Sequence, residues 1–131
     1  MIVPDASVVV AALLDSGPAG SWAEKVLEDE SLSAPHLLPA EVSNIIRRLN
    51  RAGDITPETA DAVHDDLIAL DIELAPFRPL ANRIWELRTN VTSYDAWYVA
   101  LAESLNVRLV TLDEKLARAT GIRCDVVTPS P

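Results

Sequence analysis

Short apolar runs alternate with longer stretches of helical periodicity along the chain. The strongest helical pattern covers residues 39–53, where apolar residues recur at positions i, i+3, i+4 and i+7 from Val42 to Leu49. Pro39 and Gly53 are typical of the start and the end of a helix. Similar patterns predict further helices over residues 20–30, 56–70, 79–89, 93–105 and 113–120.

The apolar runs between these helices have the length of buried strands. We expect strands over residues 2–4, 72–76, 107–112 and 124–129, and an extended piece over 32–38. Residues 7–15 are ambiguous, because three valines favour a strand and the following Ala-Ala-Leu-Leu favours a helix. Alternating strands and helices predict an α/β fold with a parallel sheet covered on both faces. The 131 residues contain no repeat or linker, so we expect one domain over 1–131.

The composition restricts the partners. The chain has 20 acidic residues against 11 Lys and Arg, which gives a formal net charge of −9. This balance argues against nucleic acid, because phosphates require cations, unless the acids gather where metal ions neutralise them. No apolar run has the length of a bilayer span, the start lacks the basic flank of a signal peptide, and Cys124 is the only cysteine. We therefore expect a cytoplasmic protein with no membrane partner and no internal disulfide.

Four acids fall where a parallel sheet would bind a ligand, at the carboxyl ends of its strands. Asp5 and Asp113 each follow a predicted strand, and Glu41 and Asp95 each lie in the first turn of a predicted helix. Each acid also has an ordinary explanation, because acids cap helix N-termini and complement the helix dipole. Helix capping can explain each acid alone. It explains the four together less well, because it does not account for acids at several junctions that could share one edge of the sheet.

Such a cluster of carboxylates would require a cation. Two carboxylates ~5 Å apart repel each other by about 3 kcal/mol at an effective dielectric constant of 20. All-oxygen ligation suits a hard ion, Mg²⁺ or Mn²⁺, which can activate a water and stabilise charge on a phosphodiester oxygen. Ser7 and Thr111 lie two residues from Asp5 and Asp113, respectively. They are candidates either for hydrogen bonds to these carboxylates or to a metal-bound water, or for helix capping.

Four sequence elements occur in an order that is more specific than any one of them. They are Asp-x-Ser, an Ala-Glu-x-x-Asn helix, an Asp-Ala-x-Tyr-x-Ala-x-Ala helix and Thr-x-Asp after a strand, beginning at Asp5, Ala40, Asp95 and Thr111. Together, over nearly the whole chain from residue 1 to 129, they resemble a PIN-domain ribonuclease, specifically the VapC toxins of bacterial toxin–antitoxin pairs. Pro4 departs from this pattern, because an apolar residue with a free N–H is usual there. We expect this proline to affect the strand geometry and not the site.

The resemblance implies a fold, a site and partners. The implied fold is a three-layer α/β/α arrangement with a central five-stranded parallel sheet. Asp5, Glu41, Asp95 and Asp113 would be the catalytic residues and metal ligands, with Mg²⁺ or Mn²⁺ as the cofactor. The implied activity is endonucleolytic hydrolysis of RNA to a 5′-phosphate and a 3′-hydroxyl, with transfer RNA as the first expected substrate and ribosomal RNA as the next.

The partners that the resemblance implies are a second copy of the chain and another protein. The expected assembly is a homodimer, with a larger hetero-oligomer as a further form. The other protein would be a cognate VapB-type antitoxin whose C-terminal segment covers or enters the acidic groove. An arginine-bearing segment would suit this role, because guanidinium pairs well with carboxylate.

Residues near Glu41 on the same predicted helix are further candidates. Asn44 is three residues away and is a possible supporting residue that orients substrate or a metal-bound water. Arg47, Arg48 and Arg51 follow it. These arginines could follow an RNA backbone near the metal. The alternative, a solvated helix face or a contact to an acidic part of the antitoxin, fits them equally well.

The remaining conspicuous side chains are interpreted as structural. Trp22, Trp85 and Trp97 lie at helical spacings, so we expect core or dimer packing and not base stacking. His36 lies among apolar residues and prolines and is expected to be partly buried. His64 lies beside two aspartates and is expected to be solvated. We assign neither histidine to catalysis.

Two other functions remain open. A housekeeping PIN nuclease of RNA maturation would share the site, although a small chain with no added RNA-binding domain favours the toxin. A phospho-acceptor receiver domain is also an α/β protein with an acidic Mg²⁺ pocket. A receiver, however, has paired acids after its first strand, an Asp after a middle strand and a Lys after its last. Here Asp5 is alone after the first strand, and the strands at 72–76 and 124–129 are not followed by Asp or Lys.

Overall fold

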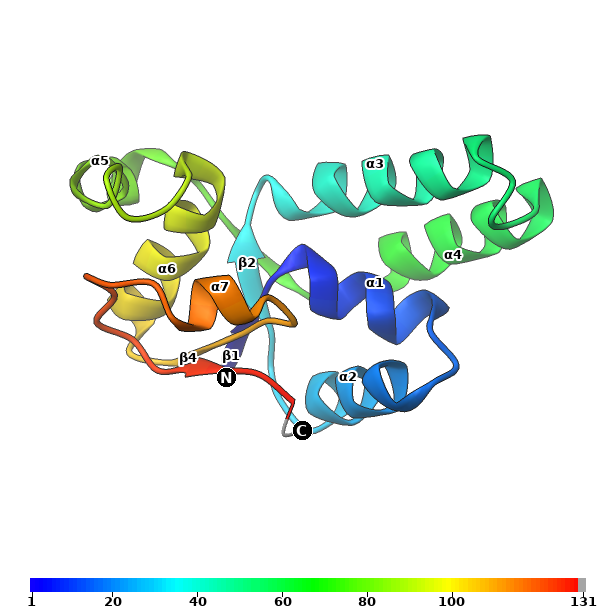
Figure 1. The fold of residues 1–131 in the computed structure, drawn as a ribbon, viewed down its shortest axis with the longest axis horizontal. Helices are drawn as coiled ribbons and strands as arrows, with labels where there is room; N and C mark the ends of the chain where they lie inside the picture. The colour runs from blue at the N-terminus through cyan, green and yellow to red at the C-terminus, as the bar shows by residue number, and fades with distance from the viewer. Residues whose placement is uncertain (130–131) are drawn as a thin grey trace.

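The structure, a computed structural model, describes residues 1–129, in which helices and short strands alternate (Figure 1). The strands are β1 (Ile2–Pro4), β2 (Ser33–Pro35), β3 (Glu73–Ala75), β4 (Arg108–Val110) and β5 (Val126–Val127). The helices are α1 (Ala6–Leu14), α2 (Pro18–Glu28), α3 (Leu38–Arg51), α4 (Pro57–Ala69), α5 (Ala81–Glu86), α6 (Ser93–Leu105) and α7 (Glu114–Ala117), with a 3₁₀ turn η1 (Arg78–Leu80). The ambiguous stretch 7–15 is therefore helical as far as Leu14. No helix in the described range combines the length and apolar character needed to cross a membrane.

The strands form two parallel sheets. β4 pairs with β1 and with β5, which gives a three-stranded sheet in the order β1-β4-β5. β2 pairs with β3 in a separate two-stranded sheet, and a single parallel bridge between Ile2 and Leu32 links the two sheets. The mixed α/β class is confirmed. The prediction of one continuous five-stranded sheet is not confirmed for residues 1–129.

Pro4 explains the interruption between β1 and β2. The Ile2 N–H donates to the Ser31 carbonyl at 3.0 Å on the β2 side, and the Asp5 N–H donates to the Val110 carbonyl at 3.0 Å on the β4 side. Successive N–H groups of a strand point alternately to its two neighbours, so an N–H at position 4 would point to β2. Proline has no N–H, and the hydrogen bond to β2 at this position is therefore missing. The pairing with β4 is unaffected, so Asp5 follows at the level of the end of β4.

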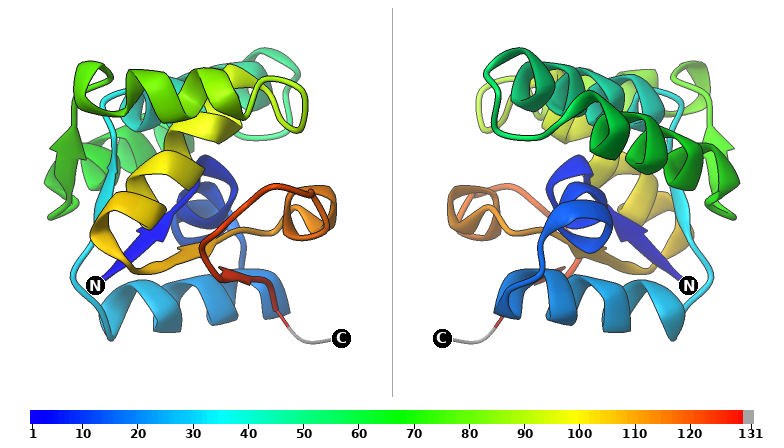
Figure 2. Two further views of the ribbon diagram at one scale, coloured as in Figure 1. Left: turned by 90° about the vertical axis from the view of Figure 1, so that its left-hand side faces the viewer. Right: turned by 90° about the vertical axis from the view of Figure 1, so that its right-hand side faces the viewer.

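Side chains of β1 and β4 alternate between two apolar clusters, because successive residues of a strand point to opposite faces. Val3 and Leu109 belong to the larger cluster, to which α3, α4, α5, α6 and α7 contribute. Ile2 and Val110 belong to the smaller cluster, with α2. α1 contributes to both clusters. The views in Figure 2 show helices on both sides of the strands, as the α/β prediction required.

One predicted environment is wrong and another is only partly decided. Trp22 and Trp97 pack against the core as expected, whereas Trp85 is 65% exposed on α5, so it is not in the core and its alternative, dimer packing, stays a prediction. His36 is exposed and not partly buried, because it lies in the turn between β2 and α3. His64 is exposed, as predicted.

Candidate active site

Asp5 lies at the junction of β1 and α1. It is only 8% exposed, and its side chain caps α1 by accepting from the Val8 N–H at 3.3 Å. The Ser7 hydroxyl donates to Oδ1 of Asp5 at 2.5 Å, and the Thr111 hydroxyl donates to Oδ2. Two of the three candidate supporting residues, Ser7 and Thr111, therefore both hold the Asp5 carboxylate, one from α1 and the other from the end of β4.

The segment after β4 is tied to the same place. The Leu112 N–H donates to Oγ of Ser7 at 3.1 Å, and the Asp113 N–H donates to Oγ1 of Thr111 at 3.0 Å. Asp113 caps the short helix α7 by accepting from the Lys115 N–H at 2.9 Å. The first and fourth strands thus bring Asp5 and Asp113 to one edge of the sheet, as expected for neighbouring parallel strands.

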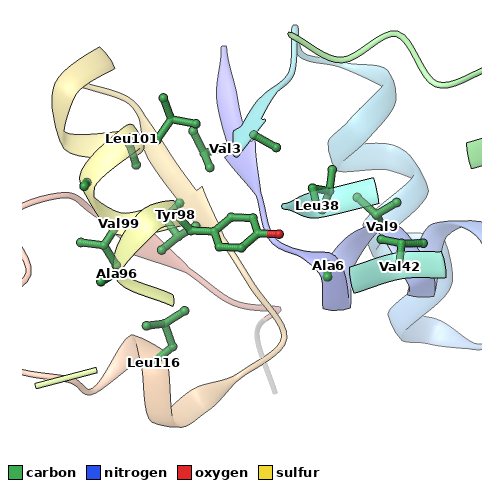
Figure 3. Close-up of a cluster of buried hydrophobic side chains, with 14 of the residues drawn as sticks. Val3, Ala6, Val9, Leu38, Val42, Ala96, Tyr98, Val99, Leu101 and Leu116 are labelled. Carbon is green, nitrogen blue, oxygen red and sulfur yellow. The ribbon is translucent and has the colours of Figure 1, made fainter. Parts of the chain in front are cut away.

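Glu41 reaches the site from the first turn of α3 and is held by a residue that the sequence did not identify. Its Oε1 accepts from the Tyr98 hydroxyl at 2.6 Å. Tyr98 is only 2% exposed, and Figure 3 shows its ring extending from α6 with the hydroxyl toward Ala6 and Leu38. A signal was available, because Tyr98 lies three residues after Asp95 and therefore on a neighbouring part of the same helix surface.

Asp95 lies half-buried in the first turn of α6. Its N–H donates to Oγ1 of Thr92 at 3.1 Å, so Thr92 caps the helix as the spacing suggested. Asp95 and Asp113 line the same surface hollow. Asp95 therefore brings a carboxyl group to a surface that a ligand can reach.

Burial raises the pKa of three of the acids, and repulsion from neighbouring acids adds to this for Glu41 and Asp95. Burial is the largest cause for Asp5, and it outweighs the hydrogen bonds that lower this pKa. Burial also raises the pKa of Glu41, with smaller contributions from the charges of Asp95 and Asp5. The pKa of Asp95 is raised by burial and then by the charges of Asp5 and Asp113. These interactions connect all four acids in one electrostatic cluster.

The donor set suits a hard divalent cation, although it is not a preformed cage. Carboxylate oxygens are the ligands that Mg²⁺ and Mn²⁺ prefer. Within residues 1–129, no three acidic, histidine or cysteine side chains are placed so that they could hold an ion together. The carboxylates of Asp5, Glu41 and Asp113 each accept hydrogen bonds from the chain instead. Mg²⁺ usually keeps several waters and binds one or two carboxylates, so these residues fit an ion held partly through water.

The other predicted residues lie outside this cluster. Asn44 is exposed on α3, and the structure places no hydrogen bond between it and the four acids in the part of the chain it describes. Arg47, Arg48 and Arg51 are exposed along the same helix. Their role stays a prediction.

The raised pKa of Asp95 predicts a specific effect of pH on stability. A carboxyl group whose pKa is higher in the folded than in the unfolded state stabilises the fold below its unfolded pKa of about 4. This stabilisation is lost as the pH rises through the folded pKa. In EDTA at pH 7, Asp95→Asn should therefore raise the melting temperature by roughly 1–3 °C, and the gain should disappear below about pH 4.

Thermal unfolding followed by circular dichroism at several pH values measures this effect. Burial raises the pKa of Glu103, but hydrogen bonds from Arg83 and the Arg123 N–H lower it more, so its pKa in the fold is below the usual value. Ionised Glu103 therefore stabilises the fold as the pH rises, whereas ionised Asp95 destabilises it. For this reason the difference between parent and variant is used, with Asp61→Asn on the exposed face of α4 as the control. A lower melting temperature of Asp95→Asn at pH 7 would contradict the electrostatic account.

A parallel α/β fold with converging acids at the carboxyl ends of its strands is the arrangement of a nucleolytic PIN domain. The chain belongs to the PIN domain family, whose model matches residues 2–122. Ribonuclease VapC1 of Mycobacterium tuberculosis (strain ATCC 25618 / H37Rv) is 42% identical over 125 residues, which cover 95% of this chain and 94% of that protein. These matches confirm the predicted resemblance to the VapC ribonucleases and rule out the receiver domain.

Solved structures agree on the fold. VapC20 of Mycobacterium tuberculosis, described as a toxin that cleaves the sarcin-ricin loop, matches with a TM-score of 0.70 at 15% identity, covering 98% of this chain and all of that one. VapBC2 from Rickettsia felis, solved bound to a DNA fragment from its promoter, matches with a TM-score of 0.70 at 16% identity, covering 99% and 100%. At these identities the likeness establishes the fold class.

Proposed function

We propose that this VapC-family chain is a metal-dependent endoribonuclease that hydrolyses cellular RNA in the cytoplasm, as the toxin of a toxin–antitoxin pair. The observation that carries the proposal is one electrostatic cluster of four acids. Asp5 and Asp113 follow β1 and β4, and Glu41 and Asp95 join them from the first turns of α3 and α6. The similarity to Ribonuclease VapC1 favours this toxin over a housekeeping nuclease.

The side chains divide the work of the reaction. When bound, Mg²⁺ or Mn²⁺ would activate a water and stabilise charge on a phosphodiester oxygen. Ser7 and Thr111 fix the orientation of the Asp5 carboxylate, and Tyr98 fixes that of Glu41. Fixed carboxylates need no reorganisation when an ion and a substrate arrive. Hydrolysis of the phosphodiester would leave a 5′-phosphate and a 3′-hydroxyl.

An apolar groove next to the acids supports an antitoxin partner. It is lined by side chains of α1, α3 and the segment after α3, mainly Val10, Leu14, Ile45, Leu49 and Ile55. Ser7 and Leu112 also line it, which brings the groove to the residues that hold Asp5. An amphipathic helix of a VapB-type antitoxin fits such a groove. An arginine in the following segment would then reach the carboxylates.

Exposed apolar side chains support self-association. Ile68 on α4, Leu74 on the edge strand β3 and Phe77 after it are 69%, 36% and 43% exposed. Ile68 and Leu74 line one surface pocket, and apolar side chains gathered at the surface mark contacts between proteins. A homodimer that binds antitoxin as a larger hetero-oligomer would cover them.

Mapping of RNA 5′ ends after brief induction tests the function. We expect new 5′-phosphate ends at one or a few sites, first in transfer RNA and next in ribosomal RNA, and none after induction of Asp95→Asn. The purified chain should cut the same RNA with Mg²⁺ or Mn²⁺ and stop in EDTA. Identical ends from the parent and from Asp95→Asn would overturn the proposed function, and cleavage that persists in EDTA would overturn its dependence on metal.

A further inference from the structure

Asp95 and Asp113 share a surface hollow with two cationic residues. The hollow has a volume of about 510 Å³, within the range of ligand sites. Residues 88–92 line one part of it and α7 lines another, and they contribute Arg88 and Lys115. Two of the proposed catalytic carboxyl groups therefore lie in the same hollow as an arginine and a lysine.

These two cations are available for a ligand. Within residues 1–129, neither Arg88 nor Lys115 forms an ion pair, whereas Arg83 and Arg108 are bound to Glu103 and Glu30. A chain with a net charge of −9 repels a polyanion at most of its surface. Cations without carboxylate partners beside the acids therefore mark where a phosphate backbone can approach.

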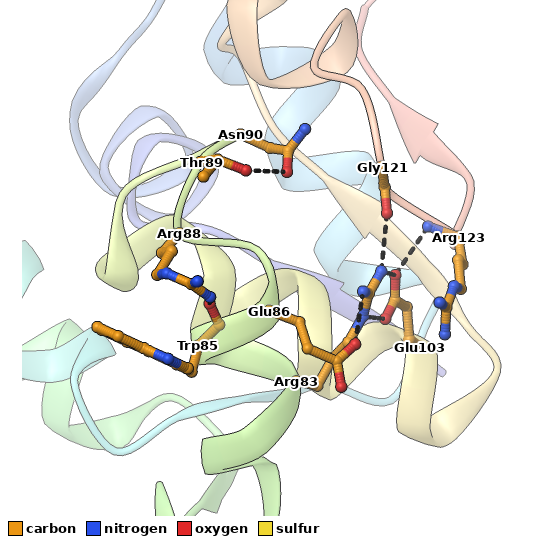
Figure 4. Close-up of polar contacts among 9 residues, drawn as sticks. All are labelled: Arg83, Trp85, Glu86, Arg88, Thr89, Asn90, Glu103, Gly121 and Arg123. Carbon is orange, nitrogen blue, oxygen red and sulfur yellow. Dashed lines mark hydrogen bonds and ion pairs between the residues drawn. The ribbon is translucent and has the colours of Figure 1, made fainter.

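Arg88 also supports an exposed aromatic ring. Its guanidinium lies 4.6 Å from the ring centroid of Trp85 and donates to the Trp85 carbonyl at 3.0 Å, as Figure 4 shows. Trp85 is 65% exposed, although an indole ring is usually buried. An exposed aromatic ring beside a cation is the combination with which proteins bind single-stranded nucleic acid, by stacking and by phosphate contact.

The short helix α5, which carries Trp85 and ends two residues before Arg88, is firmly held. Arg83 of α5 donates to the two carboxylate oxygens of Glu103 on α6 at 2.7 and 3.0 Å, and to the Gly121 carbonyl at 2.7 Å (Figure 4). The Arg123 N–H donates to the same carboxylate at 2.7 Å. These bonds fix α5 to two other segments, so Trp85 and Arg88 are presented from a supported position.

We propose that a single strand of the RNA substrate runs through this hollow. Arg88 and Lys115 bind backbone phosphates next to the phosphodiester that is cleaved, and Trp85 stacks on an unpaired base. The strand is single because a base must leave its helix to stack on a protein side chain. This inference rests on the proposed function and specifies the path of its substrate.

Binding of a labelled RNA tests the path. The probe is a 5′-fluorescein single-stranded RNA of about 12 nucleotides, measured by anisotropy with Mg²⁺ in an Asp5→Asn background that does not cleave. Arg88→Ala and Lys115→Ala should each weaken binding about fivefold to tenfold and reduce the slope of log K against log salt by about 0.7. Trp85→Ala should weaken binding about fivefold or more and leave the slope unchanged.

Two matched variants make the test specific. Lys25→Ala removes one exposed charge from α2, which lies on the other side of the molecule from α5 (Figure 1), and should change neither affinity nor slope. Arg47→Ala tests the alternative path along α3. If Arg47→Ala flattens the slope and Arg88→Ala and Lys115→Ala match Lys25→Ala, the proposed path is wrong.

The remaining outcomes separate the path from the function. If the otherwise unmodified chain cleaves RNA and Arg88→Ala, Lys115→Ala and Trp85→Ala all bind like Lys25→Ala, the path fails and the function stands. If that chain neither binds nor cleaves RNA, the function itself fails. If light scattering shows that Trp85→Ala dissociates a dimer while RNA affinity is unchanged, the surface is a contact between copies and the proposal is overturned.

Discussion

Asp95→Asn is expected to reduce RNA cleavage by about 10²- to 10³-fold or more and to abolish growth arrest, with the fold intact. A metal site supplies several kcal/mol of transition-state stabilisation, and each ~1.4 kcal/mol is a factor of ten in rate. Asp95 is the most informative of the four acids to change, because the backbone N–H of Asp95 makes the helix-capping bond to Thr92. Asn has the same shape and keeps that bond.

Initial rates on the mapped RNA, with circular dichroism of both proteins, measure the effect. Asp61→Asn on α4 makes the same chemical change at an exposed position and should retain full activity. Asp5→Asn should also be inactive, but its loss is harder to interpret, because Asp5 bonds to both Ser7 and Thr111. Unchanged cleavage and unchanged growth arrest in both Asp5→Asn and Asp95→Asn would show that these residues are not part of the catalytic site.

The parts of the fold that could be predicted from the sequence are those set by local pattern. The 3.6-residue period fixed α3 and α4 to within a few residues, because a helix buries one face. Asp5 and Asp113 could be expected together, because each follows a strand and parallel neighbours end at the same edge. Within the helix predicted over 79–89, Ile84 and Leu87 are buried at helical spacing, and Trp85 lies off their face and is exposed.

What could not be predicted depends on contacts between distant segments. The Thr111 hydroxyl binds Asp5 across 106 residues, and Tyr98 binds Glu41 across 57. No local pattern specifies which donor meets which carboxylate. Pro4 indicated that the first strand would be irregular. The sequence could not show that the missing N–H would face β2 and not β4, which is what separates β1 from β2.

The hydrogen bonds that place the acids also limit how they can bind an ion. Each bond that orients the carboxylates of Asp5, Glu41 or Asp113 uses lone pairs that a metal would otherwise accept. The four acids interact electrostatically and yet do not form a preformed cage among residues 1–129. The donors of these bonds therefore determine how many carboxylate oxygens can bind the ion directly and how many bind it through water. Ser7, Tyr98 and Thr111 should accordingly affect metal affinity without touching the substrate.

Tyr98→Phe tests this reasoning and is expected to cost about 10- to 100-fold in Mg²⁺ affinity or in activity, as changes to residues that orient metal ligands do. The variant removes one oxygen and leaves the ring in the core, where Tyr98 is 2% exposed. Glu41 then loses its 2.6 Å hydrogen bond in a half-buried position and can rotate away from the other acids. The concentration of Mg²⁺ that gives half-maximal cleavage should rise, and saturating Mg²⁺ should restore part of the rate.

Tyr94→Phe provides the matched control, because it makes the same change on the same helix at a residue that is 63% exposed. Direct titration of Mg²⁺ by calorimetry separates positioning of Glu41 from a general loss of stability, which would lower the melting temperature and leave the affinity for the ion unchanged. Losing one buried hydrogen bond destabilises a fold by about 1 kcal/mol, so Tyr98→Phe remains folded at assay temperature. Equal Mg²⁺ affinity and equal cleavage rates in Tyr98→Phe and Tyr94→Phe would show that the Tyr98 hydroxyl serves the core and not the site.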